Sequence, residues 1–443
     1  MKRTSNKLNR RQMLRGTVAL GAGAWLAGRG VAKTVSPNQK LNIAIVGCAG
    51  RGGANLEGVK GENIVALCDV DEKRLGSAAA QFRGAKTFRD FRKMLDAMHK
   101  QIDAVVVSTP DHTHALPSLT AMRLGKHVYC EKPLAWSIEE VRLMAVTARQ
   151  YKVATQMGTQ GLANDDSRVA IEVIRSGVFG EPRELHVWTD RATAWWPQGI
   201  DRPADRPPTP KNLDWDLWLG GAPERPYHPA YVPFVWRGWK DFGTGPIGDM
   251  GIHNAAVALY ALRLGPPESV AIVETSGLKP ETFPKWARLR CQFPARGGRK
   301  PVALYWYDGG QKPPESLTGC KLAANGAILV GSEGTLYSAE WTGGLWRLFP
   351  EEKFRNYQRP ERTLPRAPRQ DHYLEWLQAC KGGSPAFCNF ADFAAPLTEV
   401  MLVGALALRL GKDLRWDAEK MQADCPEAAP LVRREYRKGW EIK

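Results

Sequence analysis

The chain has 443 residues, of which 43% are hydrophobic and 24% charged, a balance typical of a soluble globular protein with two or three domains. No continuous apolar run reaches the roughly 18 residues that cross a bilayer, so a membrane-spanning protein is excluded. The formal charge of +16 suggests nucleic acid, but nine of the 62 basic residues lie in residues 1–40, which contain no acid. The rest of the chain is only mildly basic, and we expect no nucleic-acid partner.

Residues 1–32 have the pattern of an export signal. Arg10 and Arg11 precede a short apolar stretch, and Gly30-Val31-Ala32 resembles a cleavage site. The adjacent arginines are typical of a twin-arginine signal. We therefore expect the twin-arginine export machinery as a partner, a periplasmic or otherwise exported location, and a linker over residues 33–40. A basic arm before a surface helix is the alternative.

From Leu41 onward, short β-branched runs alternate with helical stretches, which indicates a parallel α/β sheet. The expected strands there are 41–46, 64–68, 104–108 and 127–130, with helices from Gly53, at 115–124 and at 137–151. Near Gly158 the alternation of short strands with helices ends. The later expected strands, 184–189, 270–275, 287–293 and 301–307, are separated by long loops, and helices at 371–380 and 390–410 follow. The pattern predicts an α/β domain over 41–158 and an α+β domain with a largely antiparallel open sheet over 159–443.

A glycine-rich turn, Gly47-Cys48-Ala49-Gly50-Arg51-Gly52, joins the first strand to its helix. Glycines there permit a tight turn and let the backbone approach a pyrophosphate at the helix N-terminus. Asp69 lies 22 residues after Gly47, at the end of the next strand, where a carboxylate accepts hydrogen bonds from an adenosine ribose. The pattern predicts a Rossmann domain that binds NAD through this turn and Asp69. NADP stays open because Lys73 and Arg74 lie close by, and Ala49 replaces the usual middle glycine.

Three further segments complete the pattern: Ser108-Thr109-Pro110-Asp111-His112-Thr113-His114, Glu131-Lys132-Pro133, and Gly248-Asp249-Met250-Gly251-Ile252-His253-Asn254. In this order after a Rossmann start, they resemble the Gfo/Idh/MocA oxidoreductases over nearly the whole chain after the signal. The resemblance implies a second domain that binds substrate and forms a homodimer or homotetramer. It also implies further cofactor contacts, which we assign to Arg74, Thr109, Pro110, His112, His114, Glu131, Lys132 and Pro133. The Asp111–His114 segment lacks a third convincing metal ligand, so no metal is expected.

Oxidation of a carbinol needs a base for the hydroxyl proton and a positive charge beside the developing alkoxide. Lys132 follows a strand at the carboxyl edge of the sheet, where ligands of such folds bind. Asp249 and His253 are four residues apart and share one face if a helix begins there. The resemblance implies that His253 is the acid or base and that Asp249 contacts substrate. We therefore predict Lys132, Asp249 and His253 as catalytic and substrate-binding residues.

Seven of the sixteen tryptophans lie within residues 188–239. Aromatic faces stack on sugar rings, so Trp236 and Trp239, with His228, are predicted to contact substrate. The alternative is that these side chains pack the domain or a subunit interface.

These observations predict an exported NAD(P)-dependent oxidoreductase that acts on a sugar, cyclitol or related polyol. No soluble nicotinamide pool is maintained outside the inner membrane, so the cofactor is expected to be tightly bound and non-dissociating. Two alternatives remain at this point. One is an NAD-dependent enzyme that cleaves glycosides through a transient ketone, and the other is a non-catalytic dinucleotide-bound sensor or scaffold.

Overall fold

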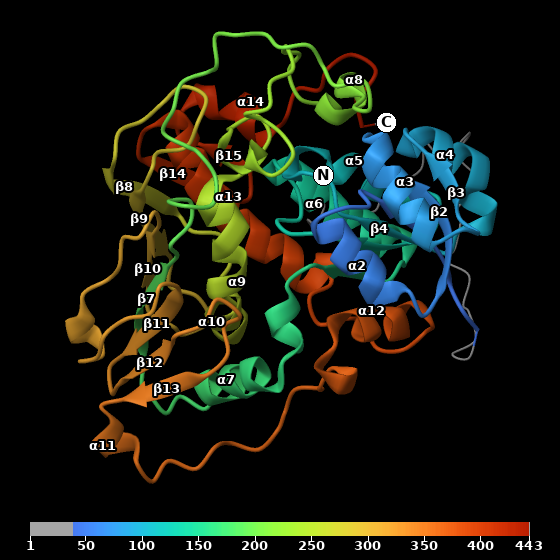
Figure 1. Ribbon diagram of the computed structural model, residues 1–443. Helices are drawn as coiled ribbons and strands as arrows, with labels where there is room; N and C mark the ends of the chain where they lie inside the picture. Colours follow the sequence, from blue (N-terminus) through green and yellow to red (C-terminus); the bar gives the residue numbers. More distant parts are fainter. Residues whose placement is uncertain (1–38, 443) are drawn as a thin grey trace, which may run out of the picture.

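A computed structural model describes residues 39–442, which form two sheets with helices packed on them (Figure 1). The predicted export signal and most of the predicted linker lie outside the described residues. The first sheet has six strands in the order β3-β2-β1-β4-β5-β6, all parallel. Its strands are β1 (Asn42–Val46), β2 (Asn63–Cys68), β3 (Lys86–Phe88), β4 (Ala104–Val107), β5 (His127–Cys130) and β6 (Thr155–Met157).

Helices connect these strands, and several begin at polar caps that the sequence supplies. They are α2 (Arg51–Val59), α3 (Glu72–Gln81), α4 (Phe91–Met98), α5 (Ala115–Arg123) and α6 (Ile138–Tyr151). Asp71 and Asp90 accept hydrogen bonds from the first backbone N–H groups of α3 and α4, and Ser137 with Glu140 forms a capping box on α6. The strand order reverses between β1 and β4, which opens a crevice at the carboxyl edge of the sheet.

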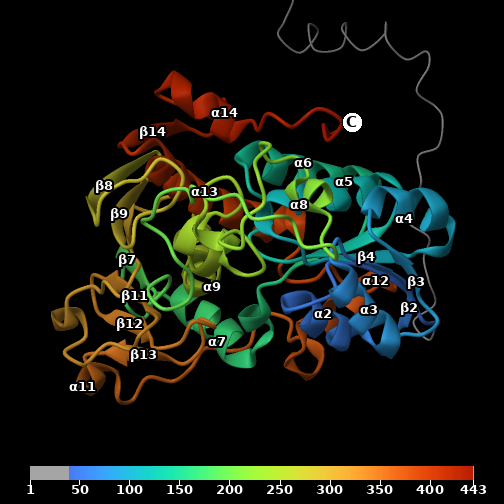
Figure 2. The same cartoon turned by 45° about the horizontal axis from the view of Figure 1, so that its top comes forward.

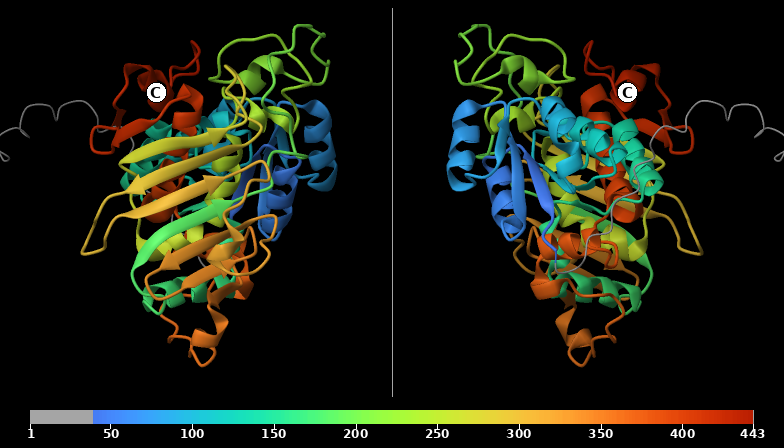
Figure 3. Two further views of the ribbon diagram at one scale, coloured as in Figure 1. Left: turned by 90° about the vertical axis from the view of Figure 1, so that its left-hand side faces the viewer. Right: turned by 90° about the vertical axis from the view of Figure 1, so that its right-hand side faces the viewer.

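The second sheet has nine strands in the order β13-β12-β11-β7-β10-β9-β8-β14-β15, and only the β10–β7 pair is parallel. The predicted fold class, a Rossmann domain plus a largely antiparallel open sheet, is therefore confirmed. One broad face of this sheet carries no helix within the described chain, as Figure 3 shows. The strands are β7 (Pro182–Trp188), β8 (Ser269–Thr275), β9 (Ala287–Phe293), β10 (Val302–Tyr307), β11 (Gly326–Gly331), β12 (Thr335–Ser338), β13 (Trp346–Phe349), β14 (Leu414–Asp417) and β15 (Gln422–Ala423).

The remaining helices pack mainly on the other face of this sheet or between the two sheets (Figures 1 and 2). They are α7 (Asp165–Arg175), α8 (Trp215–Leu219), α9 (Ile252–Asn254), α10 (Ala256–Leu262), α11 (Glu351–Phe354), α12 (His372–Cys380), α13 (Ala395–Leu410) and α14 (Ala429–Val432). A π-helical turn, η5 (Ile247–Gly251), precedes α9, and another, η8 (Phe390–Ala394), precedes α13.

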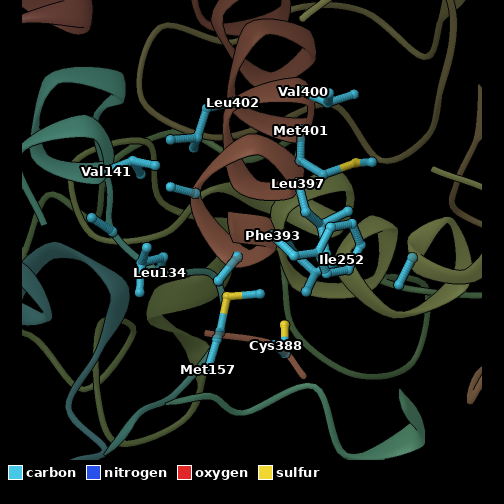
Figure 4. Packing of buried hydrophobic residues seen from close by; sticks show 14 of the residues in the cluster. Leu134, Val141, Met157, Ile252, Cys388, Phe393, Leu397, Val400, Met401 and Leu402 are labelled. Atoms are coloured by element: carbon cyan, nitrogen blue, oxygen red, sulfur yellow. The ribbon is translucent and has the colours of Figure 1, made fainter. Parts of the chain in front are cut away.

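The core helix α13 joins the two halves of the molecule. Figure 4 shows Leu397, Met401 and Leu402 of this helix among apolar side chains that include Leu134 and Val141 of the first half. The stretch Phe390–Leu410 is long and apolar enough to cross a membrane, yet 83% of its most apolar part is buried inside the protein. In the described residues this helix is the centre of a hydrophobic core.

Helix α12 returns to the first sheet from far along the chain. Its side chains Trp376, Leu377 and Cys380 pack into one cluster with Ile43 and Ile45 of β1. Trp376 is fully buried there. The predicted boundary at residue 158 remains a prediction, but the Rossmann half is not made from residues 41–158 alone.

Candidate active site

A cavity of about 730 Å³ runs along the carboxyl edge of the first sheet. One wall comes from the ends of the Rossmann strands, and the other comes from residues 210–237 and the C-terminal tail. Eleven of the predicted site residues line it. They are Gly47, Ala49, Gly50, Arg51, Asp69, Arg74, Thr109, Pro110, Glu131, Lys132 and Trp236.

The glycine turn has the geometry of a dinucleotide cradle. Gly47 has φ of 88°, and a Cβ added to it would lie 2.7 Å from the Ser108 carbonyl oxygen. A Cβ on Gly52 would lie 2.0 Å from the carbonyl oxygen of Gly47, so this glycine packs behind the wall and not in it. Gly50 has φ of 59° and meets nothing within 4 Å among residues 39–442. The turn thus keeps two close backbone contacts and one open glycine, with the methyl group of Ala49 at the cavity wall.

The groups around this cradle fit a dinucleotide. In the described chain no side chain caps the N-terminus of α2, which leaves its first N–H groups for an anion. The hydroxyl of Thr109, just after β4, is buried without a hydrogen-bond partner among the residues the structure describes. Buried polar atoms of this kind are usually paired, so Thr109 points to a ligand.

Asp69 ends β2 and is held in place by the backbone. Its Oδ2 accepts a hydrogen bond from the Cys48 N–H at 2.9 Å, and its Oδ1 accepts one from the Asp71 N–H at 3.0 Å. Burial raises the pKa of Asp69 above its ordinary value. Arg74 pairs with Asp71 at 3.6 Å, so its charge is already partnered. The carboxylate keeps free lone pairs at the cavity wall, as ribose hydroxyls require.

Glu131 is the centre of a buried hydrogen-bond network under the cavity. Its Oε1 accepts from Arg51 Nε at 3.0 Å, from Asn55 Nδ2 at 3.0 Å and from the Tyr129 hydroxyl at 3.2 Å. Burial acts to raise the pKa of Glu131, but the charges of Arg51 and Lys132 hold it below its ordinary value. Tyr373 of α12 accepts from Arg51 Nη2 at 3.0 Å and donates to Asn55 Oδ1 at 2.6 Å. Helix α12 therefore helps to fix Arg51 against the cofactor site.

Lys132 follows β5 and is paired across the two halves of the molecule. Its Nζ donates to Asp249 Oδ1 at 2.6 Å and to the Asp249 carbonyl oxygen at 2.8 Å. Arg237 Nε reaches the same Oδ1 at 3.4 Å. Burial acts to raise the pKa of Asp249, but Lys132 and Arg237 hold it well below its ordinary value. The Lys132–Pro133 peptide bond is cis.

His253 lies behind this pair, in α9. It is buried, its Nδ1 has no hydrogen-bond partner in residues 39–442, and its ring meets the edge of Trp341 at 5.2 Å between centroids. Burial and then the charge of Lys132 lower the pKa of His253 well below its ordinary value. The ring is neutral at physiological pH. Asp249 and His253 flank Lys132 but do not line the cavity itself.

The two histidines of the 108–114 loop do not line the cavity, and their assignment as cofactor contacts stays a prediction. His112 Nε2 is hydrogen-bonded to the Trp218 carbonyl at 3.0 Å, and its ring packs on Trp218. His114 is hydrogen-bonded to the carbonyl oxygens of Thr109 at 2.7 Å and Pro133 at 2.8 Å. These histidines position the loops that carry Thr109 and Lys132, and Pro133 likewise lies behind the wall.

His114 carries a positive charge in this position. Two carbonyl partners require an N–H on both ring nitrogens. Burial disfavours the charged ring, yet Cys130, Asp111 and the Pro133 carbonyl raise the pKa of His114 to about 10.

Of the predicted substrate contacts outside the catalytic trio, only Trp236 lines the cavity. Trp239 is fully buried, and its Nε1 donates to the Ala230 carbonyl at 2.8 Å. His228 pairs with Asp205 at 3.2 Å. The packing alternative holds for Trp239, and His228 belongs to the surrounding loop.

Several wall residues had no signal in the sequence. They lie far from the recognised motifs, and only the fold brings them to the cavity. They include Asn212, Leu213, Arg237 and Trp440.

Comparison with known families explains this arrangement. Residues 41–159 match the family model described as "Oxidoreductase family, NAD-binding Rossmann fold", and residues 164–298 match "Oxidoreductase family, C-terminal alpha/beta domain". The chain belongs to the Gfo/Idh/MocA oxidoreductase family. The predicted resemblance is thus confirmed, and this Gfo/Idh/MocA chain has an NAD-binding Rossmann domain and the fold of an oxidoreductase.

Relatives of this Gfo/Idh/MocA chain have several activities. A 1,5-anhydro-D-fructose reductase from Ensifer adhaerens is 27% identical over 227 residues, 50% of this chain and 55% of the relative. A "Glycosyl hydrolase family 109 protein" from Solibacter usitatus is 32% identical over 198 residues, 40% of this chain and 44% of the relative. The matches thus span about half the length of these relatives.

Among solved structures, the WlbA dehydrogenase from Bordetella pertussis in complex with NADH and UDP-GlcNAcA has the same fold. The TM-score is 0.59 at 17% identity, covering 86% of this chain and 99% of that one.

Proposed function

We propose that this Gfo/Idh/MocA chain is an exported oxidoreductase that oxidises a hydroxyl group of a sugar, cyclitol or related polyol and keeps its nicotinamide cofactor bound. The observation that carries the proposal is the pairing of Lys132 with Asp249. This pair lies beside His253, at the end of the cavity away from Asp69. The reductase relative, whose name states a sugar-derived substrate, supports the substrate class.

When bound, the nicotinamide ring would supply the hydride acceptor, and a second carbonyl compound, or a later step of the same reaction, would take the hydride back and restore it. Lys132 lines the cavity, and we assign its ammonium group to the substrate oxygen, where its charge stabilises alkoxide character. Asp249 and Arg237 fix the position of that ammonium group. His253 is neutral and its Nδ1 has no hydrogen-bond partner among the described residues, so we assign it the role of accepting the proton of the substrate hydroxyl.

We propose NAD, in preference to NADP, as the retained cofactor. Asp69 places a buried carboxylate at the cavity wall, and its charge repels a 2′-phosphate. The second wall, from residues 210–237 and the C-terminal tail, supports retention because it covers the site from outside.

The proposal also includes export of the chain and its assembly into a homo-oligomer. Export rests on the paired arginines and the apolar stretch of residues 1–32. A homodimer or homotetramer is supported by the face of the nine-stranded sheet that carries no α-helix in Figure 3, and Val273 of β8 is 56% exposed. An exposed sheet face of this extent favours a partner surface.

Cleavage of a glycoside through a transient ketone is a second candidate. It begins with removal of the same proton and hydride, so Lys132 and His253 serve both reactions. The relative named "Glycosyl hydrolase family 109 protein" favours it as an alternative.

Product analysis of the mature protein tests the proposal. Mass spectrometry of the supernatant after denaturation identifies the retained nucleotide. A panel of free sugars, cyclitols and aryl glycosides is then followed at the nicotinamide absorbance and by chromatography. A ketone product without bond cleavage supports the proposal, and a released reducing sugar supports glycoside cleavage. No product from any compound contradicts both.

A further inference from the structure

The wall that faces the Rossmann strands is built from two segments distant in sequence. The first is the stretch Asn212–Asp214, which lies against the residues that follow β2. Asn212 Nδ2 donates to Asp71 Oδ1 at 2.9 Å, and Asp214 N–H donates to the Val70 carbonyl at 3.0 Å. Leu213 forms a β-bridge with Asp71. This segment is thus attached to the turn after β2 that contains Asp69, the carboxylate predicted to bind the ribose.

The second segment is the C-terminal tail, residues 433–442. Arg437 Nη1 pairs with Asp216 of α8 at 2.5 Å, and Arg437 Nε donates to the Gly220 carbonyl at 3.1 Å. Trp440 is 7% exposed, and the Arg92 guanidinium of α4 lies 3.9 Å from its ring centroid. Figure 1 shows the C-terminus beside α8 and α4. The tail therefore binds both halves of the molecule, and Trp440 closes the gap between them.

The order of the strands along the sheet indicates which part of the cofactor lies next to Trp440. Along the carboxyl edge the cavity meets β3, β2, β1, β4 and β5 in turn. Lys132 follows β5 at one end, and Asp69 follows β2. Trp440 contacts α4, which follows β3, so it stands at the other end of the cavity, beyond Asp69. With the ribose at Asp69 and the reacting end at Lys132, this end takes the adenine.

We propose that Trp440 binds the adenine ring of the dinucleotide and that the tail holding it prevents the cofactor from dissociating. The inference rests on the proposed function only in that a dinucleotide is the ligand. An indole beside a flat heteroaromatic base contributes stacking that does not depend on the reacting end of the cofactor. Because Arg437 pairs with Asp216 of α8 and Trp440 packs against Arg92 of α4, the cofactor leaves past Trp440 only when the tail detaches from α8 or α4.

Dissociation of the nucleotide tests this inference. The full mature chain is compared as wild type, Trp440→Ala and Arg437→Ala, with exposed Arg433→Ala as a control that removes an equal charge from the same tail. Circular dichroism and thermal unfolding confirm that each variant folds. Bound nucleotide per chain after dialysis, and its release rate into excess unlabelled NAD, are then measured. We expect release from Trp440→Ala and Arg437→Ala to be about 10- to 100-fold faster, and Arg433→Ala to match wild type.

Two fragments of the cofactor separate this inference from the proposed function. ADP-ribose should bind Trp440→Ala about tenfold or more weakly than wild type, whereas nicotinamide mononucleotide should bind both equally. Equal binding of ADP-ribose to both proteins would overturn the inference, as would an unchanged release rate in Trp440→Ala. If wild type is isolated without nucleotide, the proposed retention fails, and the ADP-ribose comparison still decides whether Trp440 binds the adenine.

Discussion

Lys132 Nζ lies 2.6 Å from Asp249 Oδ1, although 117 residues separate the two and each comes from a different half of the molecule. Both side chains are largely buried, with 14% and 12% of their surfaces exposed. A close pair of opposite charges in such a place is strongly coupled, and removal of one partner leaves the other without compensation. The reacting end of the cavity therefore forms only when both halves are docked.

Removal of either predicted catalytic side chain should abolish most of the activity. Lys132→Ala loses the charge beside the alkoxide and His253→Ala loses the proton acceptor, so each should lower turnover by about 100-fold or more. Lys300→Ala, on an exposed hairpin, is the control and should leave turnover unchanged. Initial rates on the identified substrate provide the measurement. Near-wild-type turnover of His253→Ala would show that the base is another group.

The carboxylate of Asp69, predicted to bind the ribose, should determine the choice between NAD and NADP. Asp69→Ala removes a charged acceptor, so NAD should bind about 10- to 100-fold more weakly, while discrimination against NADP falls. Titration calorimetry with both nucleotides measures this, with exposed Asp96→Ala as the control. If both affinities stay unchanged in Asp69→Ala, the carboxylate does not face the ribose.

Neighbouring glycines at the start of α2 should respond in opposite ways. Gly52→Ala forces a Cβ to 2.0 Å from a backbone oxygen, so we expect about 1–3 kcal/mol lower stability and loss of dinucleotide binding. Gly53→Ala meets its nearest atom at 3.6 Å and should be neutral or stabilising by up to about 1 kcal/mol. Urea unfolding of the two variants provides the comparison. Equal effects would contradict the packing of this turn.

The charge on His114 should make stability depend on pH in the alkaline range. Its folded pKa of about 10 lies above its ordinary value of 6.5, so its contribution is complete below about pH 6.5 and is lost as the pH rises toward 10. At about 1.4 kcal/mol per pKa unit, the upper limit is about 5 kcal/mol. The free energy of unfolding of wild type should therefore fall more steeply over this range than that of His114→Gln. Parallel curves would show that His114 is not charged in the folded protein.

The paired arginines should direct the chain out of the cytoplasm. Replacing Arg10 and Arg11 with lysine keeps the charge but removes the signal pattern, so the protein should accumulate in the cytoplasm. Arg15→Lys is the matched control and should leave export unchanged. Immunoblots of cell fractions measure the distribution. Export that persists in the double variant would contradict a twin-arginine route.

Sequence patterns predicted the strands and helices whose formation depends mainly on residues close together in the chain. Strands β5 and β9 were expected at 127–130 and 287–293 and have those bounds, because short β-branched or alternating runs end at clear turns. The glycine turn and Lys132 were found because their spacing follows the strands. The short strands β3 and β6 gave no pattern of their own, and they are placed by pairing with neighbours.

The rest of the site depends on contacts between distant segments. The π-helical turn at Ile247–Gly251 and the docking of Trp440 have no local signature. The histidines of the 108–114 loop were assigned to the cofactor because their sequence position is right. Only the structure shows that both rings are hydrogen-bonded to backbone carbonyls, His112 through Nε2 and His114 through both ring nitrogens. Residue type and spacing indicate where a loop lies but not which way each side chain turns.

The return of α12 and of the tail to the Rossmann sheet has a consequence for biosynthesis. A ribosome that has completed the six-stranded sheet has not yet made Tyr373, Trp376 or Trp440, which complete its packing and close its cavity. The first half therefore stays unfinished on the nascent chain until residues 373–440 have emerged. We expect a dinucleotide to be held only after these side chains have been made and have docked, which for the proposed exported enzyme means before it passes through the membrane.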